Sequence, residues 1–187
     1  MKKNIAIILV LSCSLRIQGF PEKYLKSTCY SNKFGEAFPD DICLLKNFLE
    51  KAKNICDGRY QKAWFFCGLP ESKKTRALQF IAEESNTPLY FYTAKSIADS
   101  KDSKNITSEV DRIYKNAEDV ANNNNKTILI VIDEIDLLDK DQAKELSASL
   151  KSQIDRVKDN PYIVTIITGN NISRIDDGLL SRCSLIK

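Results

Sequence analysis

An unbroken apolar run, Ile128 to Ile132, followed directly by two carboxylates, constrains the fold of this chain more than any other feature. A strand with one face in water alternates apolar and polar side chains, whereas a continuous run of isoleucine, leucine and valine predicts a strand buried on both faces. Such strands lie inside parallel sheets, and ligands bind beyond their carboxyl ends in open α/β folds. Asp133 and Glu134 therefore stand at a predicted ligand-binding edge. The alternative is that these two acids only cap a following turn or helix.

Strands and helices alternate along the chain, which predicts an α/β fold with a doubly wound parallel sheet flanked by helices. The strands are expected at residues 63–67, 89–92, 128–132, 162–168 and 184–186. Apolar residues at helical spacing predict helices at 41–55, 107–121 and 141–157, and one more that contains Ala77, Leu78, Ile81 and Ala82 on one face. The polar run Asn122 to Asn125 is expected to be a loop that leads into the central strand.

Length and composition limit the kinds of reaction and ligand that this chain can support. A chain of 187 residues predicts one domain, with or without an appendage. Its 28 basic and 25 acidic residues are spread along the sequence and leave a net charge of +3, so nucleic acid is not an expected partner. Histidine is absent, and the six cysteines lack ligand-like spacing, which argues against a zinc site. Chemistry must therefore depend on carboxylates, lysine, arginine, hydroxyl groups or thiols.

The segment Gly68 to Thr75 joins the predicted strand 63–67 to the helix that follows it. A strand, a loop ending in Lys-Thr and a helix is the layout of a phosphate-binding loop. The Lys74 ammonium is expected to reach the β- and γ-phosphates, and the Thr75 hydroxyl to hold Mg²⁺ with Asp133, while backbone N–H groups at the start of the helix cradle the phosphates. The candidate nucleotide-binding residues are Gly68, Pro70, Ser72, Lys73, Lys74 and Thr75.

This loop departs from the pattern G-x-x-x-x-G-K-S/T. Gly68 supplies the first glycine, but Lys73 occupies the place of the second, and Glu71 stands where the protein family that this loop resembles usually has a further glycine. A residue other than glycine in a left-handed conformation costs on the order of 1–2 kcal/mol, and a glutamate near phosphate adds repulsion. Weakened nucleotide binding is therefore expected.

The order of these motifs resembles that of the AAA+ ATPases, in particular the AAA subgroup that includes FtsH-like proteases and related unfoldases. The resemblance covers residues 38–187, with 68–75 in the place of the Walker A loop and Ile130 to Asp136 similar to the Walker B strand. It implies a P-loop NTPase fold with five strands in the sheet, the Walker A strand near the middle. By the same resemblance, Asp133 organises Mg²⁺ and Glu134 polarises the attacking water. No helical lid subdomain is expected after residue 187.

Two further residues take roles from the resemblance. Asn170, with Asn171 as the near alternative, stands where the family has a polar sensor that positions the water. The stretch Ser181-Arg182-Cys183 is similar to the arginine-finger region of clamp loaders, so Arg182 is expected to reach a neighbouring subunit's nucleotide and to support a homo- or hetero-oligomeric ring. Otherwise Arg182 is a surface charge at a helix end.

The leading functional hypothesis is an ATP-binding protein that uses ATP and Mg²⁺ and hydrolyses ATP weakly or only with a partner. The alternative is a catalytically impaired pseudo-ATPase that acts as a scaffold or partner of a complete AAA ring. A third hypothesis, a clamp-loader-like replication subunit, rests only on residues 181–183.

The N-terminal sequence predicts a targeting or anchoring segment that is separate from the nucleotide-binding core. Residues 1–19 combine two early lysines, an apolar run and small residues, which is typical of a signal peptide or of a membrane or lipid anchor at Cys13. The alternative is a buried segment that is never processed. Residues 20–37 are expected to be an irregular lead-in, and 38–187 the nucleotide-binding core. The N-terminus favours a secreted or membrane-anchored protein, whereas an ATP site favours a compartment that contains ATP.

Overall fold

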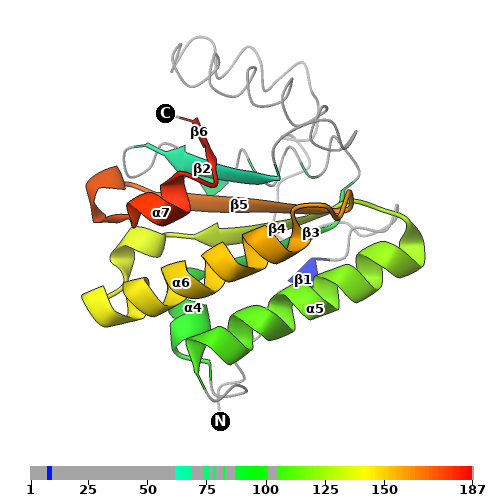
Figure 1. Cartoon of the computed structure of the whole chain (residues 1–187), viewed down its shortest axis with the longest axis horizontal. Coiled ribbons are helices and arrows are strands. Elements are labelled where there is room, and N and C mark those ends of the chain that lie inside the picture. Colours follow the sequence, from blue (N-terminus) through cyan, green and yellow to red (C-terminus); the bar gives the residue numbers. More distant parts are fainter. Residues whose placement is uncertain are drawn as a thin grey trace, which may run out of the picture.

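The computed structural model describes residues 8–9, 62–68, 74–75, 78, 82, 87–100 and 105–186 of the chain. The strands within these ranges form one sheet in the order β1-β3-β4-β5-β2-β6 (Figure 1). Their bounds are β1 Ile8–Leu9, β2 Ala63–Cys67, β3 Leu89–Thr93, β4 Ile128–Asp133, β5 Ile163–Gly169 and β6 Ser184–Ile186. The strands from β2 to β6 are all parallel, which confirms the predicted five-stranded parallel sheet.

The sheet agrees with the expectation except for one additional strand. The short strand β1 adds a sixth member, pairing antiparallel with β3 through Ile8 and Leu9, and it comes from the segment in which a signal peptide or anchor was predicted. Among the five parallel strands the middle place belongs to β5, and β2 lies next to it, between β5 and the edge strand β6, which agrees with the predicted place near the middle. The phosphate loop that was predicted after β2 therefore begins one strand away from the middle of the sheet.

The central strands β4 and β5 are buried along their whole length, as the unbroken apolar run of β4 and the mostly apolar sequence of β5 predict. Pairing in register brings the carboxyl ends of neighbouring strands to the same level, with Cys67 opposite Gly169 and Thr93 opposite Asp133. The last residues of β2, β3, β4 and β5 consequently share one edge of the sheet, which is where the sequence predicts the site.

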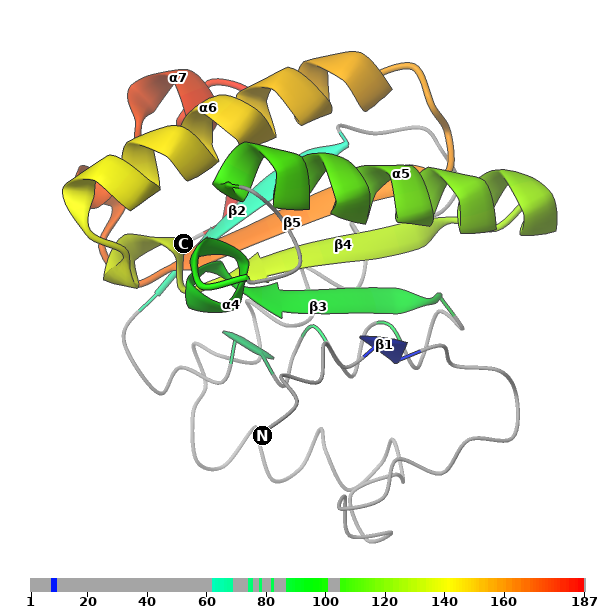
Figure 2. The same cartoon turned by 90° about the horizontal axis from the view of Figure 1, so that it is seen from below.

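Helices cover the sheet, and Figure 2 shows α5, α6 and α7 together on one face. The described helices are α4 Ala94–Ala98, α5 Ile106–Asn124, α6 Lys140–Val157 and α7 Asp177–Leu180, with 3-10 turns η2 Ile135–Leu137 and η3 Ile172–Arg174. On the opposite face, Leu78 and Ala82 are helical. They form a buried apolar cluster with Trp64 and Phe66 of β2 and with the residues of β4 and β5 whose side chains lie on that face. Apolar clusters on both faces explain why β4 has no polar face.

The helix α5 is longer than predicted, because the asparagines expected to form a loop continue it to Asn124. Asn125 ends the helix in the left-handed conformation (φ 49°), and its N–H donates to the carbonyl of Ala121. Asparagine tolerates this conformation better than most residues, so the polar run marks the end of the helix rather than its absence.

The helix predicted at 41–55 lies outside the described residues. Within the described ranges, no helix has the length and apolarity needed to cross a membrane.

Candidate functional site

The described residues that were predicted to bind phosphate and Mg²⁺ meet at the carboxyl edge of the sheet. The Lys74 ammonium donates to the side-chain oxygen of Asn170 over 2.7 Å and to the carbonyl of Gly68 over 2.8 Å. The Thr75 hydroxyl donates to Asp133 Oδ2 over 3.1 Å. Three separate segments of the chain, the helical residues Lys74 and Thr75 and the ends of β4 and β5, thus supply polar groups at one edge of the sheet. Pro70, Ser72 and Lys73 lie outside the described residues.

Asp133 is the last residue of β4, and only 7% of its surface is exposed. Besides the bond from Thr75, Asp133 accepts a hydrogen bond through Oδ1 from the hydroxyl of Thr168, a fully buried residue of β5. The Thr168 oxygen in turn accepts the backbone N–H of Glu134 over 3.0 Å. Thr168 therefore fixes both the metal-binding candidate and the backbone of the catalytic candidate, a role that sequence reasoning missed. The only signal was a hydroxyl residue near the end of an apolar strand.

Glu134 follows Asp133 with its backbone in the left-handed region (φ 59°, ψ 45°). Its side chain is exposed, in contrast to the buried carboxylate of Asp133. For residues other than glycine this backbone conformation is uncommon and costs on the order of 1 kcal/mol. The turn directs two adjacent acids into different environments, so they are suited to different tasks: a buried carboxylate for a cation and an exposed one for water.

A third acid completes the site. Asp136 is 5% exposed and accepts the backbone N–H groups of Asn170 and Asn171 over 3.1 and 3.2 Å. Asp136 belongs to the stretch that resembles the Walker B strand, but no role was predicted for it from the sequence. These two hydrogen bonds connect the turn after β4 to the turn after β5.

The electrostatics of the site centre on Lys74. Burial lowers the pKa of its amine below the usual 10.5, while the negative charge of Asp133, Asp136 and Glu134 opposes that shift, together with Cys67. The amine is therefore close to several acids without being stabilised by them enough to offset its lost hydration. An anion placed against Lys74 would restore favourable charge, which is the chemistry that a phosphate group offers.

The oxygen ligands of Thr75 and Asp133 fit Mg²⁺, which prefers hard oxygen donors and is commonly held by one or two carboxylates plus phosphate oxygens of a substrate. Within the described residues no group of three or more Asp, Glu, Cys or His is arranged to hold a metal ion. The donor set therefore suits a cation that arrives with a phosphorylated ligand.

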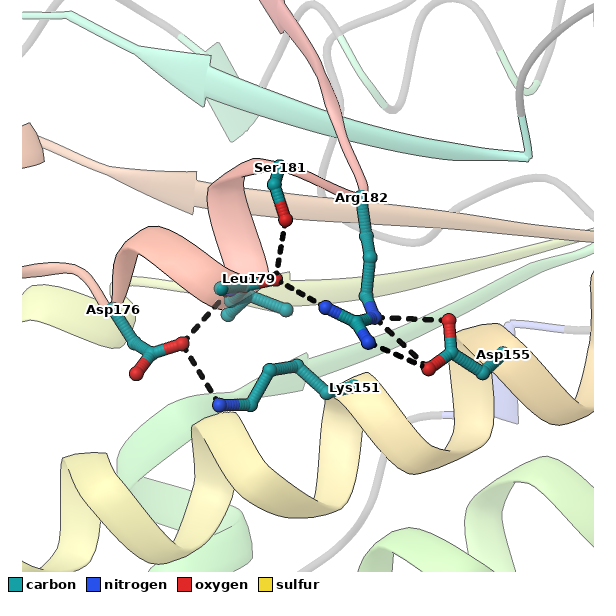
Figure 3. A network of polar contacts seen from close by, with 7 residues as sticks. Lys151, Asp155, Asp176, Leu179, Ser181 and Arg182 are labelled. Atoms are coloured by element: carbon teal, nitrogen blue, oxygen red, sulfur yellow. Dashed lines mark hydrogen bonds and ion pairs between the residues drawn. The ribbon is translucent and has the colours of Figure 1, made fainter.

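Arg182 lies elsewhere in the fold, just after α7, on the side of the sheet that α6 covers (Figure 3). Its guanidinium makes three contacts of 2.8–3.0 Å with the carboxylate of Asp155 in α6 and donates to the carbonyl of Gly178 over 2.7 Å. The bonds from Arg182 hold the pKa of Asp155 below its usual value. A second ion pair, between Lys151 and Asp176 over 2.9 Å, joins the same two helices. Arg182 is thus not among the residues that meet at the carboxyl edge, and its role as a finger stays a prediction.

Comparison with known proteins identifies the same region of the chain. A family model described as "ATPase family associated with various cellular activities (AAA)" matches residues 64–186. Among curated proteins, none matches.

Many solved structures have a similar fold. C. elegans PCH-2 has a TM-score of 0.56 at 16% identity, covering 79% of this chain and 42% of that one. A chain of the E. coli MS115-1 HORMA:CdnC:Trip13 complex has 0.55 at 14% identity, with 84% and 55% covered. The FIGL-1 AAA domain in complex with ADP has 0.55 at 21% identity, with 74% and 47% covered. This chain spans about half the length of these proteins, and at such identities the likeness concerns the fold alone.

Proposed function

This chain belongs to the AAA family of ATPases, and we propose that it binds ATP with Mg²⁺ at the carboxyl edge of its sheet and hydrolyses it weakly or with the help of a partner. The observation that carries the proposal is the convergence of Lys74 and Thr75 on Asn170 and Asp133. An ammonium, a hydroxyl and a buried carboxylate at one edge of the sheet are the groups that a magnesium–triphosphate needs from a protein.

Each residue has a task in this proposal. Lys74 exchanges its bonds to Asn170 and Gly68 for the β- and γ-phosphate oxygens of ATP. Thr75 and Asp133 would hold Mg²⁺, which neutralises charge on the phosphates when bound. The exposed carboxylate of Glu134 accepts a proton from the attacking water, and the Asn170 side chain orients that water. Arg182 supplies positive charge to the nucleotide of a neighbouring subunit, as an arginine finger does in oligomeric members of the family.

Two features support weak activity rather than efficient turnover. Lys73 and Glu71 replace glycines in the loop, so close approach of its backbone to phosphate is costly. ATP must also displace the two oxygen acceptors, on Gly68 and Asn170, that already accept hydrogen bonds from the Lys74 ammonium. In addition, the ion pair between Arg182 and Asp155 has to open before the finger can act in trans.

That ion pair favours the second candidate function, a pseudo-ATPase that serves as a scaffold or partner of a complete AAA ring. In such a protein Arg182 only fastens α7 to α6, and the ring contact is made by other surfaces. One structural neighbour comes from a complex with HORMA and CdnC proteins, which supports looking for a protein partner.

Residues 1–19 remain proposed as a signal peptide or anchor. Intact-mass measurement of the expressed protein tests whether they are removed.

The deciding experiment is a titration of the protein with labelled ATP and Mg²⁺, followed by turnover assays. Saturable binding at or below millimolar ATP is expected. Glu134→Gln should preserve affinity and abolish hydrolysis, whereas Glu145→Gln on the exposed face of α6 should change neither. Absence of saturable binding would leave only the scaffold, and unchanged hydrolysis in Glu134→Gln would remove that residue from its role.

A further inference from the structure

The strand β3 lacks the features that usually keep an edge strand from pairing with another chain. Its sequence, Leu-Tyr-Phe-Tyr-Thr, has no charged residue, proline or glycine and consists largely of strand-forming residues. The strand at the other end of the parallel set, β6, has only three residues. Short length, charges and prolines are the means by which sheet proteins prevent edge-to-edge association. We therefore expect β3 to need a cover, and an uncovered β3 to bind another strand.

The strand β1 provides this cover. Ile8 lies opposite Tyr90 and Leu9 lies opposite Leu89, in the antiparallel pair that Figure 2 shows beside β3. The pairing includes two residues of β1, whereas β3 has five residues. Each backbone hydrogen bond contributes only about 1 kcal/mol to stability, so so short a pairing can open at a modest cost in free energy.

The backbone of β3 shows which of its groups face outward. The carbonyl of Pro88, just before β3, accepts the N–H of Leu129 in β4 over 2.9 Å. Backbone groups point alternately to the two sides of a strand, so those of Leu89 and Phe91 face away from β4. Within the described residues the pairing with β1 ends at Tyr90, so Phe91 lies beyond it.

The residues that cover β3 belong to the segment for which targeting or anchoring is proposed. An apolar run that enters a membrane, or that is removed by processing, cannot pair with β3 at the same time. The two roles of residues 8–9 exclude each other, and the outer edge of β3 opens whenever the N-terminus is used elsewhere.

We propose that the outer edge of β3 is a self-association surface, which Ile8 and Leu9 keep closed within one chain. Once β1 is detached, this edge pairs with β3 of a second copy. A second copy fits because a two-fold axis places a strand antiparallel to its own copy, and β1 already pairs with β3 in that direction. The second β3 also has the same uncharged, strand-forming sequence. None of these residues belongs to the proposed ATP site, so the inference is independent of the proposed function.

The test measures molar mass by light scattering, without nucleotide, on the full chain, whose intact N-terminus is verified by mass. Ile8→Pro/Leu9→Pro removes both backbone N–H groups of β1 and should give twice the mass of the monomeric wild type. Ile8→Asp/Leu9→Asp detaches β1 without proline, because aspartate disfavours strands, and should have the same effect. Ser12→Pro/Ser14→Pro, in the same segment but outside β1, is the matched control and should leave the mass unchanged.

A further substitution locates the contact. Phe91→Pro removes an outward-facing N–H and leaves the hydrogen bonds to β4 in place, so adding it to either β1 variant should restore the monomer. Phe91→Ala also removes the aromatic side chain but keeps the N–H, and should leave the dimer intact. Circular dichroism and thermal melting verify that each variant is folded.

Folded β1 variants that stay monomeric would overturn the inference, and so would a wild type that is dimeric to the same extent as these variants. A dimer that persists with Phe91→Pro would overturn it as well, because another surface would then hold the two copies together. ATP binding is measured separately, and its absence would leave the self-association surface in place.

Discussion

The amine of Lys74 lies 2.7 Å from the side-chain oxygen of Asn170, although 96 positions separate the two residues in the sequence. This contact joins a helical residue that follows β2 to the turn after β5. Two residues with separate predicted roles, one for phosphate and one for water, thus belong to one hydrogen-bonded group. A ligand that draws Lys74 toward its phosphates also releases the amide of Asn170 for a new partner.

Replacing Lys74 with alanine should lower ATP affinity about 10- to 100-fold, since a hydrogen bond to a charged group contributes about 1.5–3 kcal/mol. The matched control is Lys62→Ala. Lys62 is also half-buried, and its amine donates to the carbonyl of Asn160 over 3.0 Å near the start of β5, at the opposite edge of the sheet. Equilibrium titration with labelled ATP should show the loss in the first variant alone. Equal losses in both would indicate general destabilisation.

ATP affinity should decrease as the pH rises toward the alkaline range. Burial lowers the pKa of Lys74 below 10.5. Phosphate binds the charged amine, so affinity is greatest below that lowered pKa and falls as pH rises through it. Lys74→Arg keeps its charge throughout, because guanidinium does not deprotonate in proteins. Titrations between about pH 7 and about pH 10 should therefore show a decline in the wild type that is absent in the arginine variant. Parallel declines would assign the effect to another group.

Removing the Thr168 hydroxyl should destabilise the fold. Thr168→Val has nearly the same shape but leaves Asp133 without one donor and the Glu134 N–H without its acceptor. Leaving buried polar groups unpaired costs about 1–3 kcal/mol each, so the free energy of unfolding in urea should fall by at least about 1 kcal/mol. Thr168→Ser keeps the hydroxyl and loses a methyl group, worth about 0.8 kcal/mol. A serine variant less stable than the valine variant would contradict this account.

Arg182 can be tested by mixing two inactive proteins. Arg182→Ala retains Glu134, and Glu134→Gln retains Arg182, so a mixed oligomer contains sites in which both groups are intact. Hydrolysis by the mixture, with little by either protein alone, is the expected result if Arg182 acts on a neighbouring subunit. Asp155→Ala removes the carboxylate that binds the guanidinium and should not reduce hydrolysis.

The outcome that would contradict the finger is a mixture no more active than its parts. If Arg182→Ala also loses thermal stability to the same extent as Asp155→Ala, the pair serves to attach α7 to α6, as the pseudo-ATPase alternative requires.

The sequence predicted the sheet well because its signals are local. The unbroken run at 128–132 and the similar run ending at Thr168 form strands buried on both faces, and Asp133 stands where β4 ends. The end of α5 was mispredicted for a local reason as well. Successive asparagines favour loops on average, but Asn124 donates from its side chain to the carbonyl of Val120 over 2.8 Å and so extends the helix.

The contacts within the site could not be predicted in the same way. That Asp136 would reach the turn after β5, or that Thr168 would bind Asp133, depends on the spacing and twist of two strands whose residues lie more than thirty positions apart. Nor does any sequence pattern indicate that Asp155 would pair with Arg182, 27 positions later. Motif spacing identifies which side chains arrive at an edge, but their partners follow from the packed structure.

The two described residues other than glycine with positive φ, Asn125 and Glu134, differ in how well their side chains suit that geometry. Asparagine adopts it readily, whereas glutamate does so against its preference. Glycine at position 134 would relax the backbone, and the resulting protein should melt at a higher temperature while losing its exposed acid. The chain thus has a lower thermal stability at this turn and keeps a carboxylate there. The requirements of the fold alone do not explain that choice of residue.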